Sequence, residues 1–233
     1  MRGAGGTERE GASSRPRTAA FRALGAALSV LVTPFVRFDL PPEEQHPAGR
    51  PVLWAPNHRS MFDIAVGLIG LYRMGDQASF FVNARYFEVP VGGRMLRAIG
   101  ALPVDLDGSG VKAIAAGVES LAEGRDLVIM AEGRLIPPDE RDGGIGSLAS
   151  GVGVLAKRAR VPVVPVAMIG TDLVLPIGSR LPRIRLGRRR LVLVRYGEPI
   201  RIEGRAREGI EAVQQSLSAL VLEAEAEYAL RER

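Results

Sequence analysis

Residues 51–63 read PVLWAPNHRSMFD, and this stretch sets the expectations for the rest of the chain. Its first half, Val52–Ala55, is an unbroken apolar run, which is typical of a strand buried on both faces. Pro56 ends that run, because proline cannot donate to a sheet ladder. His58 follows in the turn after the strand, where α/β proteins build their sites.

His58 is the candidate general base of the chain, which has two histidines and no cysteine. Imidazole titrates near neutral pH unaided, and Asp63 is placed to orient the ring and stabilise its protonated form. The spacing of five residues is not a same-face helix spacing of three or four, so we expect His58 before a helix and Asp63 in its first turn. An alternative interpretation is that Asn57 or Ser60 caps that helix and His58 is a solvated turn residue.

Working outward, apolar runs alternate with helical patterns along most of the chain. The runs predicted as strands are Val52–Ala55, Ser79–Val82, Ala101–Val104, Leu127–Ala131, Val163–Ala167 and Leu191–Val194. The segments with helical patterns are Met61–Tyr72, Arg94–Ile99, Gly110–Ala122, Ser147–Arg158 and Arg205–Arg231. This alternation predicts an α/β fold with a mostly parallel sheet flanked by helices.

The composition indicates a globular protein without disulfide or zinc sites. A chain of 233 residues, 46% hydrophobic and 24% charged, suits one globular domain with a terminal extension. The lack of cysteine excludes a disulfide scaffold and thiolate chemistry, and two histidines far apart in sequence argue against zinc. We therefore expect no metal site.

The first 38 residues differ from the remainder. Residues 1–18 are rich in Gly, Arg and Ser and are predicted to be a disordered basic tail. Residues 19–38 are strongly apolar and are predicted to be a membrane-associating helix, which leaves 39–233 as the folded domain. The uncharged part, 23–36, is shorter than the roughly 20 residues that a span needs, so an interfacial or re-entrant anchor fits better. The alternative is a helix that packs on the core.

A polar loop with anion-binding character follows the predicted strand at 127–131. It opens with Glu132-Gly133-Arg134. Glycine lets the backbone approach an anion closely, and the arginine fork binds it with two hydrogen bonds. On its own the tripeptide also fits an ordinary turn with a surface ion pair.

Taken in order, these segments resemble the 1-acylglycerol-3-phosphate O-acyltransferase family of the glycerolipid and lysophospholipid acyltransferase superfamily. The resemblance covers about residues 52–172. The first family block, Asn-His-x4-Asp, is matched by Asn57, His58 and Asp63, with Arg59 and Ser60 also typical. The third block, usually Pro-Glu-Gly-Thr-Arg, is present as the variant AEGRL at 131–135, and the strand at 161–166 matches the fourth.

The second block departs most from the family pattern. Val104-Asp105-Leu106 stands where the family often has an Ile-Asp-Arg triplet whose Arg helps to hold the acceptor phosphate. One phosphate ligand is therefore missing, which leaves the acceptor open: lysophosphatidic acid, a lysophospholipid with a larger headgroup or another lipid alcohol.

The resemblance implies a glycerol-3-phosphate-acyltransferase-like domain over 39–233 and O-acyltransferase activity. It makes His58 and Asp63 catalytic, and it makes the following residues substrate-binding: Asn57, Arg59, Ser60, Glu132, Gly133 and Arg134. No cofactor is implied; acyl-CoA or acyl carrier protein is a co-substrate. The expected partner is a membrane lipid surface, with the protein peripheral or monotopic on the cytoplasmic face of the cell membrane.

Six arginines and no acidic residue lie between Arg180 and Arg190. They fit anionic lipid headgroups, the phosphates of coenzyme A or an acidic carrier protein, or a solvated hairpin. Other functions also stay open: a non-catalytic membrane-binding relative, or thioester hydrolysis with water as acceptor. Nucleic-acid binding is not expected, because few aromatic residues accompany the arginines.

Overall fold

The computed structural model describes residues 18–41, 47, 51–105, 108, 110–184 and 187–232. Its strands are β1 (Val36–Asp39), β2 (Leu53–Pro56), β3 (Ala78–Asn83), β4 (Ala101–Val104), β5 (Asp126–Val128), β6 (Val163–Ile169) and β7 (Arg190–Tyr196). Its helices are α1 (Ala19–Val32), α2 (Phe62–Arg73), α3 (Pro90–Ala98), α4 (Val111–Ala122), α5 (Ser150–Ala159), α6 (Thr171–Val174) and α7 (Ala206–Arg231), with short 3-10 turns η2 (Ala84–Phe87) and η3 (Pro138–Glu140).

The strands form one sheet in the order β1-β7-β6-β2-β5-β3-β4. Neighbouring strands are parallel except for β6 and β7, which are antiparallel. This arrangement confirms the predicted mostly parallel α/β sheet, and each predicted strand and helix overlaps one in the structure.

The central strand β2 shows why its sequence is apolar throughout. Leu53 lies between Leu127 of β5 and Val163 of β6 in the register of the sheet. Successive side chains point to opposite faces, so Leu53 belongs to one apolar core and its neighbour Trp54 to the other.

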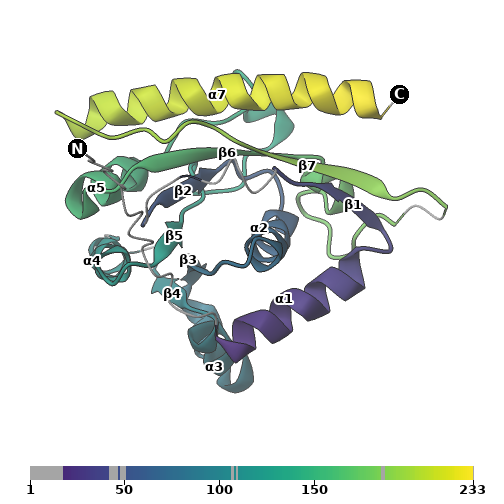
Figure 1. Cartoon of the computed structure of the whole chain (residues 1–233), viewed down its shortest axis with the longest axis horizontal. Helices are drawn as coiled ribbons and strands as arrows, with labels where there is room; N and C mark the ends of the chain where they lie inside the picture. Colours follow the sequence, from purple (N-terminus) through teal and green to yellow (C-terminus); the bar gives the residue numbers. More distant parts are fainter. Residues whose placement is uncertain are drawn as a thin grey trace, which may run out of the picture.

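Helices cover both faces of the sheet (Figure 1). One core joins the sheet to α4, α5 and α7, and the other joins it to α1, α2 and the end of α3. The long helix α7 lies along one outer side of the molecule, while α1 lies on the opposite side of the sheet.

The predicted helix over 19–38 is wrong for its last six residues, 33–38. Helix α1 ends at Val32, and Val36–Asp39 form strand β1, which pairs in parallel with β7. Pro34 stops the helix, and the residues after it alternate: Val36 is buried and Arg37 is exposed, as in an edge strand with one covered face. The boundary predicted between 38 and 39 therefore falls inside a strand.

Helix α1 has one packed face and one bare face. Phe21 is buried in the core, and Gly25 lies so close to α2 that a Cβ there would be 2.5 Å from Tyr72. The opposite face exposes Ala23, Ala27, Val30 and Leu31. Among the described residues, no helix has the length and apolarity needed to cross a bilayer.

Some predictions concern residues outside the described ones. These are the basic tail up to residue 17, Leu106 of the second block, and Arg185 within the arginine cluster.

Candidate active site

The turn after β2 brings His58 and Asp63 into direct contact. Nδ1 of His58 lies 2.9 Å from Oδ2 of Asp63. The same oxygen accepts the backbone N–H groups of Arg59 and Ser60, both at 2.8 Å. Because three donors converge on one oxygen of a fully buried carboxylate, the position of Asp63 is tightly fixed.

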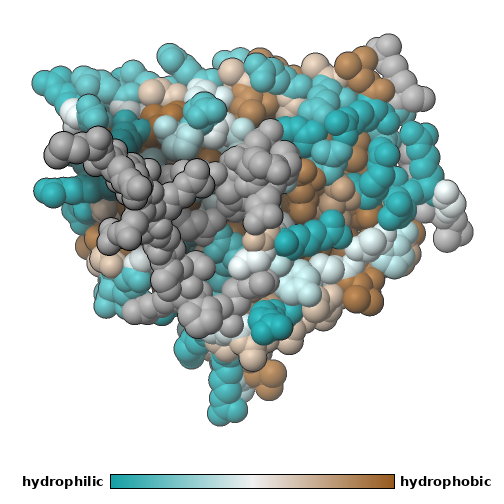
Figure 2. Space-filling model, viewed as in Figure 1, coloured by the Kyte–Doolittle hydropathy of each residue, from teal (hydrophilic) through white to brown (hydrophobic). Residues whose placement is uncertain are grey.

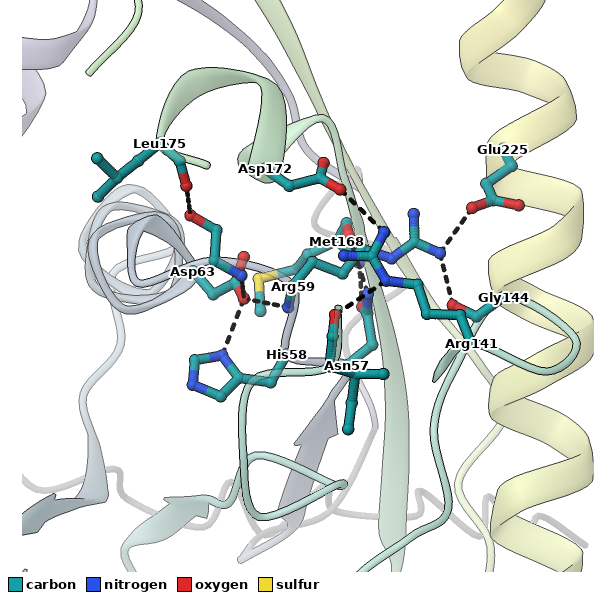
Figure 3. Close-up of polar contacts among 12 residues, drawn as sticks. Asn57, His58, Arg59, Asp63, Arg141, Gly144, Met168, Asp172, Leu175 and Glu225 are labelled. Atoms are coloured by element: carbon teal, nitrogen blue, oxygen red, sulfur yellow. Dashed lines mark hydrogen bonds and ion pairs between the residues drawn. The ribbon is translucent and has the colours of Figure 1, made fainter. Parts of the chain in front are cut away.

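This geometry determines the tautomer of His58. An ionised carboxylate only accepts hydrogen bonds, so Nδ1 carries the proton that it donates to Asp63, and Nε2 has the free lone pair. The side chain is 11% exposed, and it points away from the arginine and glutamate side chains on the other side of the turn (Figure 3). His58 is therefore oriented as a base toward the cavity described below.

Glu132, from the loop after β5, holds the backbone of the same turn. Its Oε2 accepts the N–H of His58 at 2.5 Å and its Oε1 accepts the N–H of Gly146 at 2.9 Å. Burial raises the pKa of Glu132 above its usual value, and the two backbone hydrogen bonds partly oppose that shift. The carboxylate thus joins two loops that are distant in sequence.

Asn57 and Ser60 fix the two ends of the turn. The side chain of Asn57 accepts the N–H of Met168 at 2.7 Å and donates to its carbonyl at 3.1 Å, as a strand residue would. Ser60 Oγ donates to the carbonyl of Leu175 at 2.6 Å and accepts the N–H of Phe62 at 3.0 Å. The N-cap position of α2 is Met61, which has no side-chain cap hydrogen bond, so Ser60 holds the first helical residue from one position earlier. His58 is buried and paired with Asp63, so the alternative interpretation of a solvated turn residue is wrong.

An apolar cavity of about 680 Å³ begins beside the His58–Asp63 pair. One face of α2 lines it with Ile64, Gly67, Leu68 and Leu71, so it follows that helix for about 12 Å beyond Asp63 at 1.5 Å per residue. The opposite wall comes from β3, α4, the end of β5 and α5; its members include Phe80, Val82, Ile114, Ile129, Ser150 and Val154.

Gly133 also lines the cavity, with a backbone φ of +71°. A Cβ there would lie 3.1 Å from the Cβ of Ala149 at the start of α5. A residue with a side chain would be strained in this left-handed conformation and crowded against α5. Glycine thus lets the loop after β5 turn at the cavity wall.

A sequence model of the Acyltransferase family matches residues 37–169. The chain belongs to the Acyltransferase family. The matched segment runs from β1 to the end of β6 and contains both His58 and Asp63. It ends before α7.

Two curated relatives of this acyltransferase are chloroplastic plant proteins. One is the 1-acyl-sn-glycerol-3-phosphate acyltransferase BAT2 of Brassica napus, 28% identical over 154 residues, which are 65% of this chain and 42% of the relative. The other is the 1-acyl-sn-glycerol-3-phosphate acyltransferase LPAT1 of Arabidopsis thaliana, 27% identical over 65% of this chain and 41% of the relative. This acyltransferase therefore spans less than half the length of either relative.

The fold is also found in a solved structure. The crystal structure of the 1-acyl-sn-glycerophosphate (LPA) acyltransferase PlsC from Thermotoga maritima superposes with a TM-score of 0.68 at 20% identity. The match covers 88% of this chain and 78% of that one.

Most of the predicted substrate-binding residues form hydrogen bonds with other parts of the protein. Asn57, Arg59 and Ser60 are buried, with side chains that contact other parts of the chain. Glu132 accepts the backbone N–H groups of His58 and Gly146. Substrate binding by these four residues stays a prediction, and the contacts observed here position the turn.

Arg134 lies apart from the other predicted site residues. Its side chain is 59% exposed and forms an ion pair with Glu140 in η3. It also donates to the carbonyl of Leu135, and it does not belong to the described lining of the cavity. Its role as a phosphate ligand stays a prediction.

Three charged residues near the site were not predicted from the sequence. Arg85 in η2 and Arg158 in α5 line the cavity, and Glu225 of α7 contacts Arg59. Asn83 caps η2 at the end of β3, and Arg85 lies two residues later. A polar residue directly after a predicted strand therefore could have indicated that Arg85 lies near the site. Nothing local marks Glu225, because its partner is 166 positions away.

Proposed function

We propose that this acyltransferase moves a fatty acyl group from a thioester, on coenzyme A or acyl carrier protein, to the free hydroxyl of a lysophospholipid. The preferred acceptor is 1-acylglycerol-3-phosphate, and the product is then phosphatidic acid. The observation that carries the proposal is the buried His58–Asp63 pair in the wall of a long, mainly apolar cavity. Both plant relatives are 1-acyl-sn-glycerol-3-phosphate acyltransferases, which supports the choice of acceptor.

The reaction uses Nε2 of His58 as general base. The acceptor hydroxyl attacks the thioester carbonyl and forms the new C–O bond while Nε2 takes its proton. Asp63 stabilises the imidazolium that results. When the tetrahedral intermediate collapses, the C–S bond breaks and the thiolate takes the proton from His58, so the products are an ester and a free thiol.

The cavity suits the acyl chain. Its lining along α2 and β3 is aliphatic and aromatic, and burying a methylene group there contributes about 0.8 kcal/mol. Held in this cavity, the chain would bring its thioester carbon to the end where His58 lies. No metal or cofactor has a role in this scheme.

A second acceptor class is supported by the outward position of Arg134. An acceptor with a larger headgroup than phosphate would need fewer arginine contacts inside the site. The reaction would be the same, with lysophospholipid remodelling as its purpose.

We also propose that the protein lies peripherally or monotopically on the cytoplasmic face of the cell membrane, through the bare face of α1. In Figure 2 the band of surface over α1 is largely white to brown. Val30 and Leu31 are 77% and 67% exposed. The basic segment is adjacent: the N–H of Arg190 donates to the carbonyl of Phe35, and Arg189 shares a surface hollow with Val30. Arginines at this position would meet anionic headgroups.

The deciding experiment is thiol release from palmitoyl-CoA by the purified protein. The acceptors are lysophosphatidic acid, lysophospholipids with larger headgroups, or none, with His58→Ala as the control. Release that requires lysophosphatidic acid and is lost in the mutant supports the first proposal, and release with another lysophospholipid supports the second. Release without any acceptor indicates hydrolysis instead. If palmitoyl-CoA and palmitoyl-acyl carrier protein both fail with every acceptor, the proposal is wrong.

A further inference from the structure

The turn between β2 and α2, residues 57–61, is the catalytic turn. Arg59 anchors it on the side opposite the cavity. The backbone N–H of Arg59 bonds Asp63, as described above. Its side chain runs the other way, and Nη2 donates to Glu225 Oε1 and to the carbonyl of Gly144, both at 2.6 Å (Figure 3). One residue therefore joins the catalytic carboxylate to α7.

The Arg59–Glu225 contact joins a buried guanidinium to a carboxylate that is partly open to water. The side chain of Arg59 is only 5% exposed, whereas that of Glu225 is 39% exposed. A buried guanidinium needs a partner, because its charge interacts poorly with a low-dielectric interior. Removing the carboxylate would leave Nη2 with the carbonyl of Gly144, a neutral acceptor, and we expect Arg59 to move toward water.

Helix α7 reaches the site by a second route, through the loop at 143–146. Ser218 Oγ donates to the carbonyl of Gly143 at 2.7 Å. Gly144 packs directly on the helix: its φ is +82°, and a Cβ there would lie 2.6 Å from a methyl group of Val221. The same loop supplies the Gly146 N–H to Glu132, which holds the backbone of His58.

The helix itself is firmly fixed to the sheet. Val213, Leu217 and Val221 are fully buried. A rigid helix can transmit its position to the turn, because interiors pack closely and do not absorb small shifts.

We propose that Glu225 is a positioning residue for the His58–Asp63 pair and acts through Arg59. The inference rests on the proposed function, in which this pair does the chemistry, and it extends the site to a helix outside the family-matched residues 37–169. The carboxylate of Glu225 fixes the guanidinium, the guanidinium fixes the backbone of Arg59, and that backbone N–H fixes the oxygen that orients His58.

The test compares Glu225→Ala with Glu225→Gln and with Glu227→Ala in the full chain. Glu227→Ala is the matched control, since it removes two ion pairs from the same helix, with Arg195 and with Arg231, and neither arginine contacts the catalytic turn in the described structure. We expect Glu225→Ala to lower kcat about tenfold, because small misplacements of catalytic groups cost up to roughly 10²-fold. The KM for the thioester should change little, and Glu225→Gln should recover most of kcat, since its amide oxygen still accepts from Arg59.

A spectroscopic measurement separates positioning from general stability. The chain has two histidines, so a ¹⁵N-histidine spectrum contains one imidazole for His58 and one for His46 as reference. We expect Glu225→Ala to shift the His58 resonances and Glu227→Ala to leave them in place. Unchanged His58 resonances in folded Glu225→Ala, or equal changes in both variants, would overturn the proposal. The spectrum decides this even if the protein turned over none of the substrates tested, an outcome that would count only against the proposed function.

Discussion

The backbone N–H of His58 and the carboxylate of Glu132 are joined by a 2.5 Å hydrogen bond across 74 positions of sequence. This contact connects the first and third sequence blocks of the site. The glutamate thereby controls where the histidine lies without touching its imidazole, and the loop after β5 becomes part of the catalytic turn.

Removing the base or its partner should affect turnover far more than folding. We expect His58→Ala to lower kcat by about 10²- to 10⁴-fold, the usual contribution of a positioned general base. Asp63→Asn keeps an acceptor oxygen but loses the charge that stabilises the imidazolium, so a loss of up to about 10⁴-fold is expected. Initial rates with palmitoyl-CoA, together with circular dichroism of each variant, check both values. Near-normal rates in folded His58→Ala would remove it from the mechanism.

The buried carboxylate of Glu132 should make stability depend on pH. Because burial raises its pKa above 4.5, the folded state binds this proton more tightly than the unfolded state. The contribution of Glu132 to stability is therefore fully present below pH 4.5 and declines as the pH rises through the folded pKa. Glu132→Gln lacks this titration. We expect urea unfolding to show the wild type losing stability relative to Glu132→Gln as the pH rises across that window.

Glu132→Gln should also impair the reaction, because one of the two backbone N–H groups would then face an amide NH₂ group. An unsatisfied buried donor costs about 1–3 kcal/mol. A variant as active as the wild type, with an identical stability profile over pH, would mean that the carboxylate has no such role.

Gly67 should set how long an acyl chain the cavity accepts. It lines the cavity one turn beyond Asp63, and a Cβ there would meet no atom within 4 Å. A larger side chain would project into that space at a depth of roughly 6 Å from Asp63. We expect Gly67→Leu to reduce kcat/KM for palmitoyl-CoA at least tenfold more than for octanoyl-CoA.

Gly70 supplies the control for helix propensity, since it lies in the same helix with open space at its Cβ but does not line the cavity. Gly67→Ala and Gly70→Ala should both raise Tm, because Ala exceeds Gly by about 1 kcal/mol in a helix interior. Only substitutions at Gly67 should alter chain-length preference. If the wild type and all the Gly67 and Gly70 variants show the same preference between palmitoyl-CoA and octanoyl-CoA, the acyl chain does not bind in this cavity.

If Arg134 binds the acceptor phosphate as predicted, its guanidinium must leave Glu140 to do so. Exposed ion pairs contribute about 0–1 kcal/mol, whereas a hydrogen bond to a charged group contributes about 1.5–3 kcal/mol. We expect Arg134→Ala to raise the KM for lysophosphatidic acid about tenfold with little change in the KM for palmitoyl-CoA. Glu140→Ala, which frees the guanidinium, should not raise the acceptor KM. If both constants rise together, Arg85 at the cavity wall becomes the better candidate.

Membrane contact through α1 is testable by sedimentation with vesicles of phosphatidylcholine and phosphatidylglycerol. We expect Leu31→Glu to reduce the bound fraction severalfold, since a charge on an interfacial apolar face opposes insertion. Leu230→Glu is the matched control: Leu230 is 71% exposed and lies on α7, on the other side of the sheet. Equal losses in the two variants would argue against α1 as the contact.

The elements and the dyad were predictable because their signals are local. The apolar run before Pro56 and the spacing from His58 to Asp63 carry enough information to place a strand, a turn and a helix. Strand β1 was missed because Val36–Asp39 continue an apolar stretch and pair with β7, more than 150 residues later. The outward direction of Arg134 was also unpredictable, since it depends on η3 bringing Glu140 alongside.

The contact of Glu225 with Arg59 affects the design of chimeras that exchange segments between related acyltransferases. A chimera cut at residues 37 and 169, the borders of the family match, would import a catalytic turn with Arg59 but retain a foreign C-terminal helix. Such a hybrid is expected to fold its sheet and still work slowly, because the arginine would meet a helix that did not evolve with it. The unit to transplant is the matched segment together with α7.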